Sequence, residues 1–72
     1  MMDIRREIRL KIREIREMRG FTQKELAKYM GKTQGYISSI ENGEYSIGIG
    51  VLQDIAEVLK FDIKLVPKKL KK

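Results

Sequence analysis

The residues of this chain that could do chemistry are amides and hydroxyls in one short stretch. Gln34, Ser38 and Ser39 lie around the apolar residues Ile37 and Ile40. If the stretch is helical, the two isoleucines face a core and the polar side chains face outward. Amides and hydroxyls are the groups that hydrogen-bond the edges of bases and hold phosphates. The sequence therefore predicts a surface that binds nucleic acid.

Two short helices joined by a tight turn are expected to position this surface. Thr22, followed three residues later by Glu25, forms a capping box and predicts the start of the first helix. Gly31 ends that helix, because glycine readily adopts positive φ. The small side chain of Ala27 would let the second helix cross closely over the first. The pattern over residues 22–41 is that of a DNA-binding helix-turn-helix.

Another helix is expected ahead of this motif, over about residues 3–19. Its apolar residues recur at helical spacing and are Ile4, Ile8, Ile12, Ile15 and Met18. We expect this face to pack against the next two helices. The alternative is a basic amphipathic helix on a membrane surface, which the narrow stripe without aromatic residues disfavours. Leu10 falls off the stripe and is expected at the surface or in a contact with a partner.

The remainder of the chain predicts a core helix, a strand and a basic tail. A loop over residues 44–50 leads into a helix through about Lys60 that is apolar over much of its circumference. Phe61, Ile63 and Leu65 alternate with charged residues, which is a strand pattern, and Pro67 stops it. Because a lone strand leaves its backbone groups open, we expect two copies to pair antiparallel through these three side chains. The alternative is a fifth short helix.

The expected fold is thus an all-α bundle of about four helices with a short C-terminal strand over residues 61–66. Residues 1–66 would form one DNA-binding domain, and residues 67–72 a disordered basic tail. A 72-residue chain buries a small core, so its stability is marginal and dimerisation is favoured.

The composition excludes several classes of protein. The chain has no cysteine and no histidine, so it lacks disulfides, thiolate metal sites and the commonest general base. Its ten acidic residues are scattered among basic ones, and we expect neither enzymatic activity nor a cofactor or metal. The apolar runs are short and no signal peptide is visible. We expect a protein of the cytoplasm, associated with the nucleoid and not with a membrane.

The charge balance favours an anionic partner, but most of the charge lies outside the motif. The net charge is +6 and the pI about 9.8. Residues 1–19 carry +3 (7 basic, 4 acidic), residues 20–59 carry −2 (3 basic, 5 acidic) and residues 60–72 carry +5 (6 basic, 1 acidic). The two ends are therefore expected to supply much of the attraction to phosphates. The alternative is that lysine-rich ends only maintain solubility.

Residues 12–27, Gly31 and residues 37–43 resemble the Cro/C1 (Xre) family of phage and bacterial repressors. Residues 52–59 resemble the fourth helix of that family, so the resemblance extends from 12 to 60. The C-terminal strand pattern and lysine tail are similar, more weakly, to those of HipB- and HigA-type antitoxins.

The resemblance implies roles for particular side chains. The glutamine in the position of Gln23 contacts a phosphate, and the one in the position of Gln34 hydrogen-bonds an adenine. The arginine matching Arg16 pairs with the glutamate matching Glu41, which ties the first helix to the recognition helix. The residues expected to contact DNA are Gln23, Lys24, Lys32, Thr33, Gln34, Gly35, Tyr36, Ser38, Ser39 and Asn42.

Three positions depart from the family pattern. Gly35 has no side chain at a position where the side chain of other family members often contacts a base. Tyr36 is bulky where the family is often smaller, and it either contacts DNA or packs on the preceding helix. Residues 46–50 replace the usual Pro-Ser-Leu sequence before the fourth helix, which leaves the start of that helix open.

We expect from these patterns a sequence-specific repressor that binds an inverted-repeat operator in double-stranded DNA as a homodimer. An antitoxin that binds a toxin protein and autoregulates its operon is the alternative. RNA binding is disfavoured because Tyr29, Tyr36 and Tyr45 form no stacking platform on one sheet.

Overall fold

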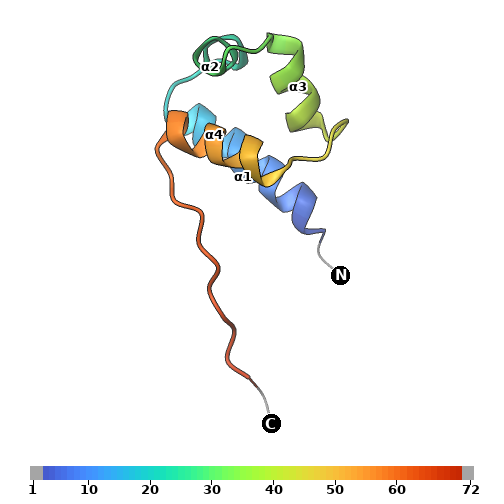
Figure 1. Ribbon diagram of the computed structural model, residues 1–72, viewed down its shortest axis with the longest axis vertical. Helices are drawn as coiled ribbons and strands as arrows, with labels where there is room; N and C mark the ends of the chain where they lie inside the picture. The colour runs from blue at the N-terminus through green and yellow to red at the C-terminus, as the bar shows by residue number, and fades with distance from the viewer. Residues whose placement is uncertain (1–2, 71–72) are drawn as a thin grey trace.

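The computed structural model describes residues 3–70 and consists of four helices followed by an extended C-terminal arm (Figure 1). The helices are α1 (Ile4–Met18), α2 (Gln23–Met30), α3 (Gln34–Asn42) and α4 (Ile49–Leu59). α3 packs mainly against α2 and also against α1, and α2 packs against α4. The observed fold is therefore the all-α, four-helix domain that the sequence predicts. Within residues 3–70, every helix is too short or too polar to cross a bilayer.

Side-chain caps and left-handed glycines define the ends of the helices in the motif. Thr22 and Glu25 form the predicted capping box, in which each side chain accepts a hydrogen bond of 3.0 Å from the backbone N–H of the other. Gly31 ends α2 with φ 67° and Gly43 ends α3 with φ 81°, a conformation that costs glycine little. α4 begins after Gly48 without a side-chain cap, so its start carries no polar signal in the sequence.

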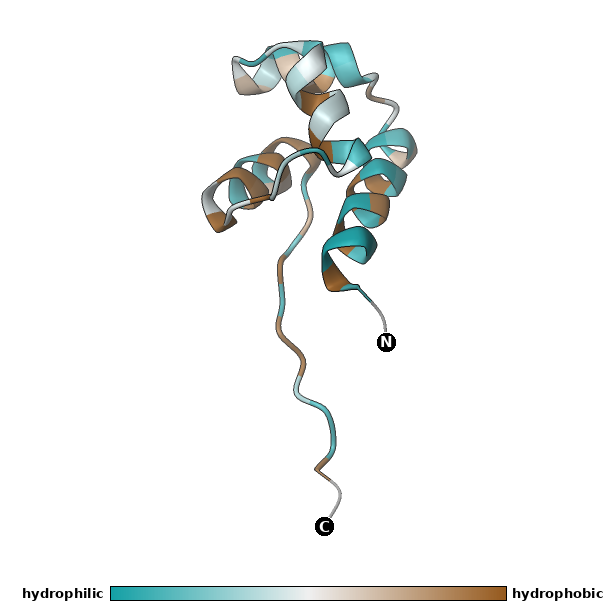
Figure 2. Ribbon diagram, turned by 90° about the vertical axis from the view of Figure 1, so that its right-hand side faces the viewer, coloured by the Kyte–Doolittle hydropathy of each residue, from teal (hydrophilic) through white to brown (hydrophobic). Residues whose placement is uncertain are grey.

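The core lies where the four helices meet, and each helix contributes to it. Figure 2 shows the apolar residues concentrated on the helix faces that meet one another. The buried side chains are Ile12 from α1, Leu26 and Ala27 from α2, Ile37 and Ile40 from α3, and Ile55, Ala56 and Leu59 from α4. The two ends of the predicted α1 stripe lie outside this core, since Ile4 is 67% and Met18 70% exposed. Leu10 is half-exposed, as expected.

The predicted strand over residues 61–66 is absent from the structure of the single chain. Residues 61–70 form neither helix nor strand. The backbone N–H of Phe61 still donates to the carbonyl of Ala56 at 3.1 Å, and the chain beyond it runs away from the helices (Figure 1). A strand needs a neighbouring backbone to accept and donate its hydrogen bonds, and residues 3–70 contain no second strand. The fifth helix is also absent there. Of the predicted tail, residues 67–70 are exposed without regular structure, and residues 71–72 lie outside the described part of the chain.

The capping box makes the stability of α2 depend on pH. The pKa of the Glu25 carboxyl lies below its ordinary value of 4.5. The main cause is the hydrogen bond that the backbone N–H of Thr22 donates to this carboxyl, and the side chain of Thr22 has a smaller effect in the same direction. Its contribution to stability is therefore fully present above pH 4.5 and is lost as the pH falls through the lowered pKa. In thermal unfolding followed by circular dichroism, Glu25→Gln should lose less stability on acidification than the parent, while the exposed Glu44→Gln should behave like the parent. Equal pH dependence of Glu25→Gln and the parent would contradict this role.

Candidate nucleic-acid interface

α2 and α3 are held in a fixed relation by a three-residue turn. The backbone N–H of Lys32 donates to the carbonyl of Ala27 at 2.8 Å, which closes the end of α2. Thr33 then caps α3 by accepting a hydrogen bond of 3.2 Å from the backbone N–H of Tyr36. Ala27 is buried, consistent with the close crossing that its small side chain permits. The turn thus sets the angle at which α3 is presented.

α3 separates its apolar and polar residues onto two faces. Ile37, Ile40 and Glu41 are buried. The predicted DNA-contacting residues of this helix lie on the other side, with Gln34, Gly35 and Asn42 exposed and Ser38 and Ser39 half-buried. Asn42 Nδ2 donates to Ser38 Oγ at 3.3 Å, which leaves the amide oxygen of Asn42 and the hydroxyl proton of Ser38 available to a partner. The structure therefore places these five residues along one accessible side of one helix.

Gly35 is not required for packing within the domain. A Cβ atom at this position would have only Thr33 Oγ1 nearby, at 3.9 Å, which is an ordinary van der Waals contact. The first turn of α3 consequently presents bare backbone beside Gln34. A partner can approach the helix more closely there than a larger residue would allow.

Tyr36 packs on the domain. Its ring is half-buried against the core cluster, and Lys32 Nζ lies 5.3 Å from the ring centroid, within the range of a cation–π interaction. The bulk of the ring thus has a structural explanation, and the same contact orders the lysine of the turn.

A buried polar network joins α1, α2 and α3 behind the interface. Glu41 accepts hydrogen bonds from Arg16 Nε at 2.6 Å, Arg16 Nη2 at 3.1 Å and Gln23 Nε2 at 3.0 Å. Arg16 Nη1 donates to the carbonyl of Phe21 at 2.7 Å. The hydrogen bonds that Arg16 donates to Glu41 raise the pKa of Arg16 despite the opposing effect of burial. The pair that the family resemblance implies is therefore present, with both residues less than a tenth exposed.

The bond between Gln23 and Glu41 is a feature that the sequence did not predict. Gln23 was expected at a phosphate, but one of its amide hydrogens is directed to Glu41. Its carbonyl oxygen, its second amide hydrogen and the unpaired backbone N–H groups at the start of α2 remain for a partner. No spacing rule links residues 23 and 41, because their meeting depends on how α2 and α3 cross.

The cations of the motif lie on α2 and in the turn. Lys24, Lys28 and Lys32 are exposed, and none of the three forms an ion pair within residues 3–70. Lys24 lies in the first turn of α2, and Lys32 lies in the turn that precedes α3. They are therefore available to bind phosphates near the starts of the two motif helices.

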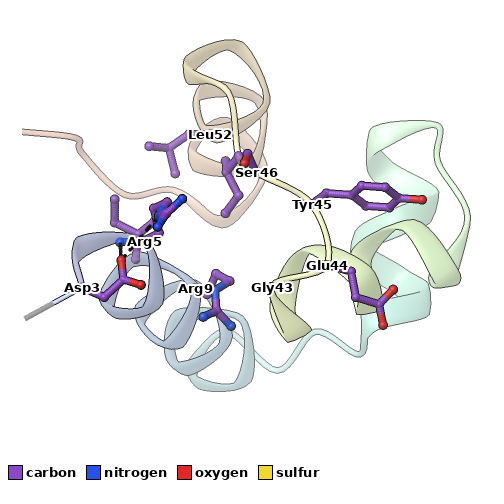
Figure 3. Close-up of a pocket in the computed structure, with 10 residues that line it drawn as sticks. Asp3, Arg5, Arg9, Gly43, Glu44, Tyr45, Ser46 and Leu52 are labelled. Carbon is purple, nitrogen blue, oxygen red and sulfur yellow. Dashed lines mark hydrogen bonds and ion pairs between the residues drawn. The ribbon is translucent and has the colours of Figure 1, made fainter.

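A cleft of about 320 Å³ lies beside the C-terminal end of α3, between the first turns of α1 and the loop that precedes α4 (Figure 3). Arg9 occupies its floor, and a Cβ added to Gly43 would lie 2.6 Å from Arg9 Cζ. The positive φ of 81° favours glycine at position 43, whereas the guanidinium of Arg9, at the end of a flexible side chain, could shift to admit a Cβ. Glu44, Tyr45 and Ser46 of the loop also line the cleft (Figure 3).

Comparison with known proteins adds independent findings. A family model described as helix-turn-helix matches residues 12–66. The chain is 44% identical over 59 residues to an uncharacterised HTH-type transcriptional regulator, y4dL, of Sinorhizobium fredii (strain NBRC 101917 / NGR234). That match covers 82% of this chain and 30% of the relative, so the chain spans less than a third of the relative's length. No solved structure gives a significant match.

Proposed function

The chain belongs to the Cro/C1-type helix-turn-helix family of DNA-binding transcriptional regulators, and from that membership we propose that it is a sequence-specific repressor. Members of this family bind DNA and are not enzymes, and the composition likewise predicts no enzymatic activity. The observation that carries the proposal is the outward face of α3, which presents amide and hydroxyl groups that have no role in the core.

The dimensions of α3 suit the major groove. An α-helix with its side chains is about 10–12 Å in diameter, which fits a groove about 12 Å wide, and the nine residues of α3 extend about 13 Å along it. In helix-turn-helix proteins the first residues of the second helix contact base edges. Gln34 stands there beside the bare backbone of Gly35, and a glutamine amide can pair with adenine through two hydrogen bonds. Two copies would then read half-sites roughly 34 Å apart in an inverted repeat.

Binding-site selection from random duplex DNA tests this proposal. The purified chain should enrich an inverted repeat whose half-sites lie about one helical turn apart. Binding that enriches no sequence and responds only to salt would contradict sequence-specific repression. It would favour the second candidate, an antitoxin whose main partner is a toxin protein. The exposed apolar residues of the arm are the observation in favour of that candidate.

Lys32→Ala should weaken binding to all DNA sequences alike. Lys32 is exposed in the turn before α3, so its loss removes a phosphate contact and no base contact. The logarithm of the binding constant should then fall less steeply with the logarithm of salt concentration, by about one unit of slope. Fluorescence anisotropy at several salt concentrations measures this. Lys11→Ala serves as the control, because Lys11 pairs with Glu14 on α1, and a slope change equal to that of Lys32→Ala would refute the assignment.

Dimerisation is proposed through residues 61–66, with Phe61, Ile63 and Leu65 paired antiparallel across a two-fold axis. Ile63 is half-exposed and Leu65 almost fully exposed in the single chain, so both can be replaced without disturbing the core. Ile63→Asp should convert the dimer into a monomer in sedimentation equilibrium, because an aspartate in an apolar interface is costly to bury. Persistence of the dimer would place the interface elsewhere, for example at Leu10.

A further inference from the structure

The arm, residues 61–70, leaves the domain in a direction that α1 fixes. Lys60 is the only non-glycine residue with positive φ among those described, at φ 61°, and it turns the chain away from α4. Arg19, the C-cap of α1, secures this turn, since its Nε donates to the carbonyl of Leu59 and its Nη2 to that of Lys60, both at 2.9 Å. The direction of the arm is thus set by specific contacts at its base.

The arm carries apolar side chains that the single chain leaves in solvent. Ile63 is 50%, Leu65 97%, Val66 80% and Leu70 88% exposed. Figures 1 and 2 show the arm running away from the helices with hydrophobic residues along its length. So many exposed apolar residues in so short a segment mark a contact with another protein surface.

α4 and the base of the arm border a groove with an apolar floor and acidic residues. The groove has a volume of about 420 Å³ and is lined by Ile49, Gln53, Ala56 and Glu57 together with residues 61–63. Ile49 is 84% exposed although it begins a helix of the core. The acidic groups of the groove are Glu57 and Asp62. Asp62 belongs to the base of the arm, whereas residues 64–70 beyond the groove carry only the cations Lys64, Lys68 and Lys69. This outer part of the arm is therefore complementary to the groove in charge and is also apolar.

We propose that the arm of a second copy lies in this groove, so that the two copies exchange arms across the dimer axis. This inference rests on the proposed dimer and specifies the surface of the second copy that each arm contacts. In a symmetric antiparallel pair centred on Ile63, Leu65 stands opposite Phe61 of the second copy. Residues 66–70 then continue over α4 of that copy, where Leu65, Val66 and Leu70 can be buried.

The lengths of the two segments agree with this arrangement. Four residues of extended chain, from Leu65 to Lys69, span about 13 Å. Six residues of helix, from Leu59 back to Gln53, span about 9 Å, and the turn at Lys60 and Phe61 lengthens this path. Lys69 of one copy is therefore expected beside Gln53 of the other. Residues 61–63 border their own α4, but the rest of the arm runs away from the helices (Figure 1), so a second copy is the better placed occupant.

Engineered cysteines test the exchange directly, because the chain has none of its own. Under mild oxidation, a mixture of Gln53→Cys and Lys69→Cys should give a disulfide-linked dimer that neither variant gives alone. In the double variant, an intrachain disulfide in a monomer would overturn the proposal, because the arm would then cover its own α4. Absence of cross-links in a sample that sediments as a dimer would overturn the exchange and leave the dimer standing. A monomer at all concentrations would overturn both.

A second variant tests the contribution of the groove to dimerisation and leaves the arm unchanged. Ile49→Glu should raise the Kd of the dimer by about tenfold to a hundredfold, from the loss of one buried aliphatic side chain. Because Ile49 is mostly exposed in the single chain, the domain should remain folded, and circular dichroism verifies this. Leu10→Glu, on α1 outside the groove, is the matched control and should leave the Kd unchanged. An unchanged Kd for Ile49→Glu would overturn the proposed site.

Discussion

Replacing Glu41 with alanine is expected to lower the free energy of unfolding by about 3–5 kcal/mol, because it leaves Arg16 buried without its counter-ion. Glu41 is the acceptor for both Arg16 and Gln23, so the substitution also removes a bond between α2 and α3. A domain of this size has a total stability of about 4–11 kcal/mol. At the lower end of that range the variant would be largely unfolded, and at the upper end it would keep about half of its stability or more.

Urea unfolding followed by circular dichroism measures this loss, and two further variants interpret it. Glu44→Ala removes an exposed carboxylate a few residues away and should change stability by less than about 0.5 kcal/mol. The double variant Arg16→Met with Glu41→Leu replaces the ion pair by apolar side chains and should recover much of the loss. A loss below about 1 kcal/mol for Glu41→Ala would show that the pair lies in water and not in the core.

Gln34→Ala is expected to weaken operator binding by about 1–3 kcal/mol and to relax the preference at one base pair in each half-site. Gln34 is exposed on α3 and makes no side-chain hydrogen bond within residues 3–70. Its loss should therefore leave the melting temperature unchanged. The effect arises because the amide can satisfy both a donor and an acceptor on one base edge.

Binding-site selection repeated with Gln34→Ala separates base reading from general affinity. The enriched sequences should match those of the parent at all positions but one in each half-site. Lys32→Ala is the comparator, because it should weaken binding while leaving every base preference in place. If Gln34→Ala weakens binding and preserves the full base preference, the residue contacts the DNA backbone and α3 is docked differently.

The helices of the motif could be predicted because their signals are local. Thr22 with Glu25, Thr33 and the glycines at 31 and 43 fix helix ends through bonds within a few residues, and the structure has each of them. The start of α4 at Ile49 was less evident, because Gly48 caps it without a side chain. Local sequence therefore determines the motif better than it determines the helix behind it.

Features that depend on contact with another part of the structure could not be predicted from the spacing of residues in the sequence. The alternating residues 61–65 indicate a strand, but the hydrogen bonds of a strand require a neighbour that the single chain does not supply. The bond from Gln23 to Glu41 depends on the crossing of α2 and α3. The exposure of Ile4 and Met18 reflects α1 extending beyond the helices that cover its centre.

Amide chemical-shift mapping on the selected operator duplex tests most directly whether α3 reads DNA. The spectrum of the ¹⁵N-labelled chain should change most at residues 34–39, at the start of α2 and at Lys32, with smaller changes in the arm. Those changes should persist at a salt concentration that releases the chain from unrelated DNA. Changes confined to α1 and the arm, with α3 unaffected, would contradict the account and show that the basic ends hold the DNA while α3 does not read it.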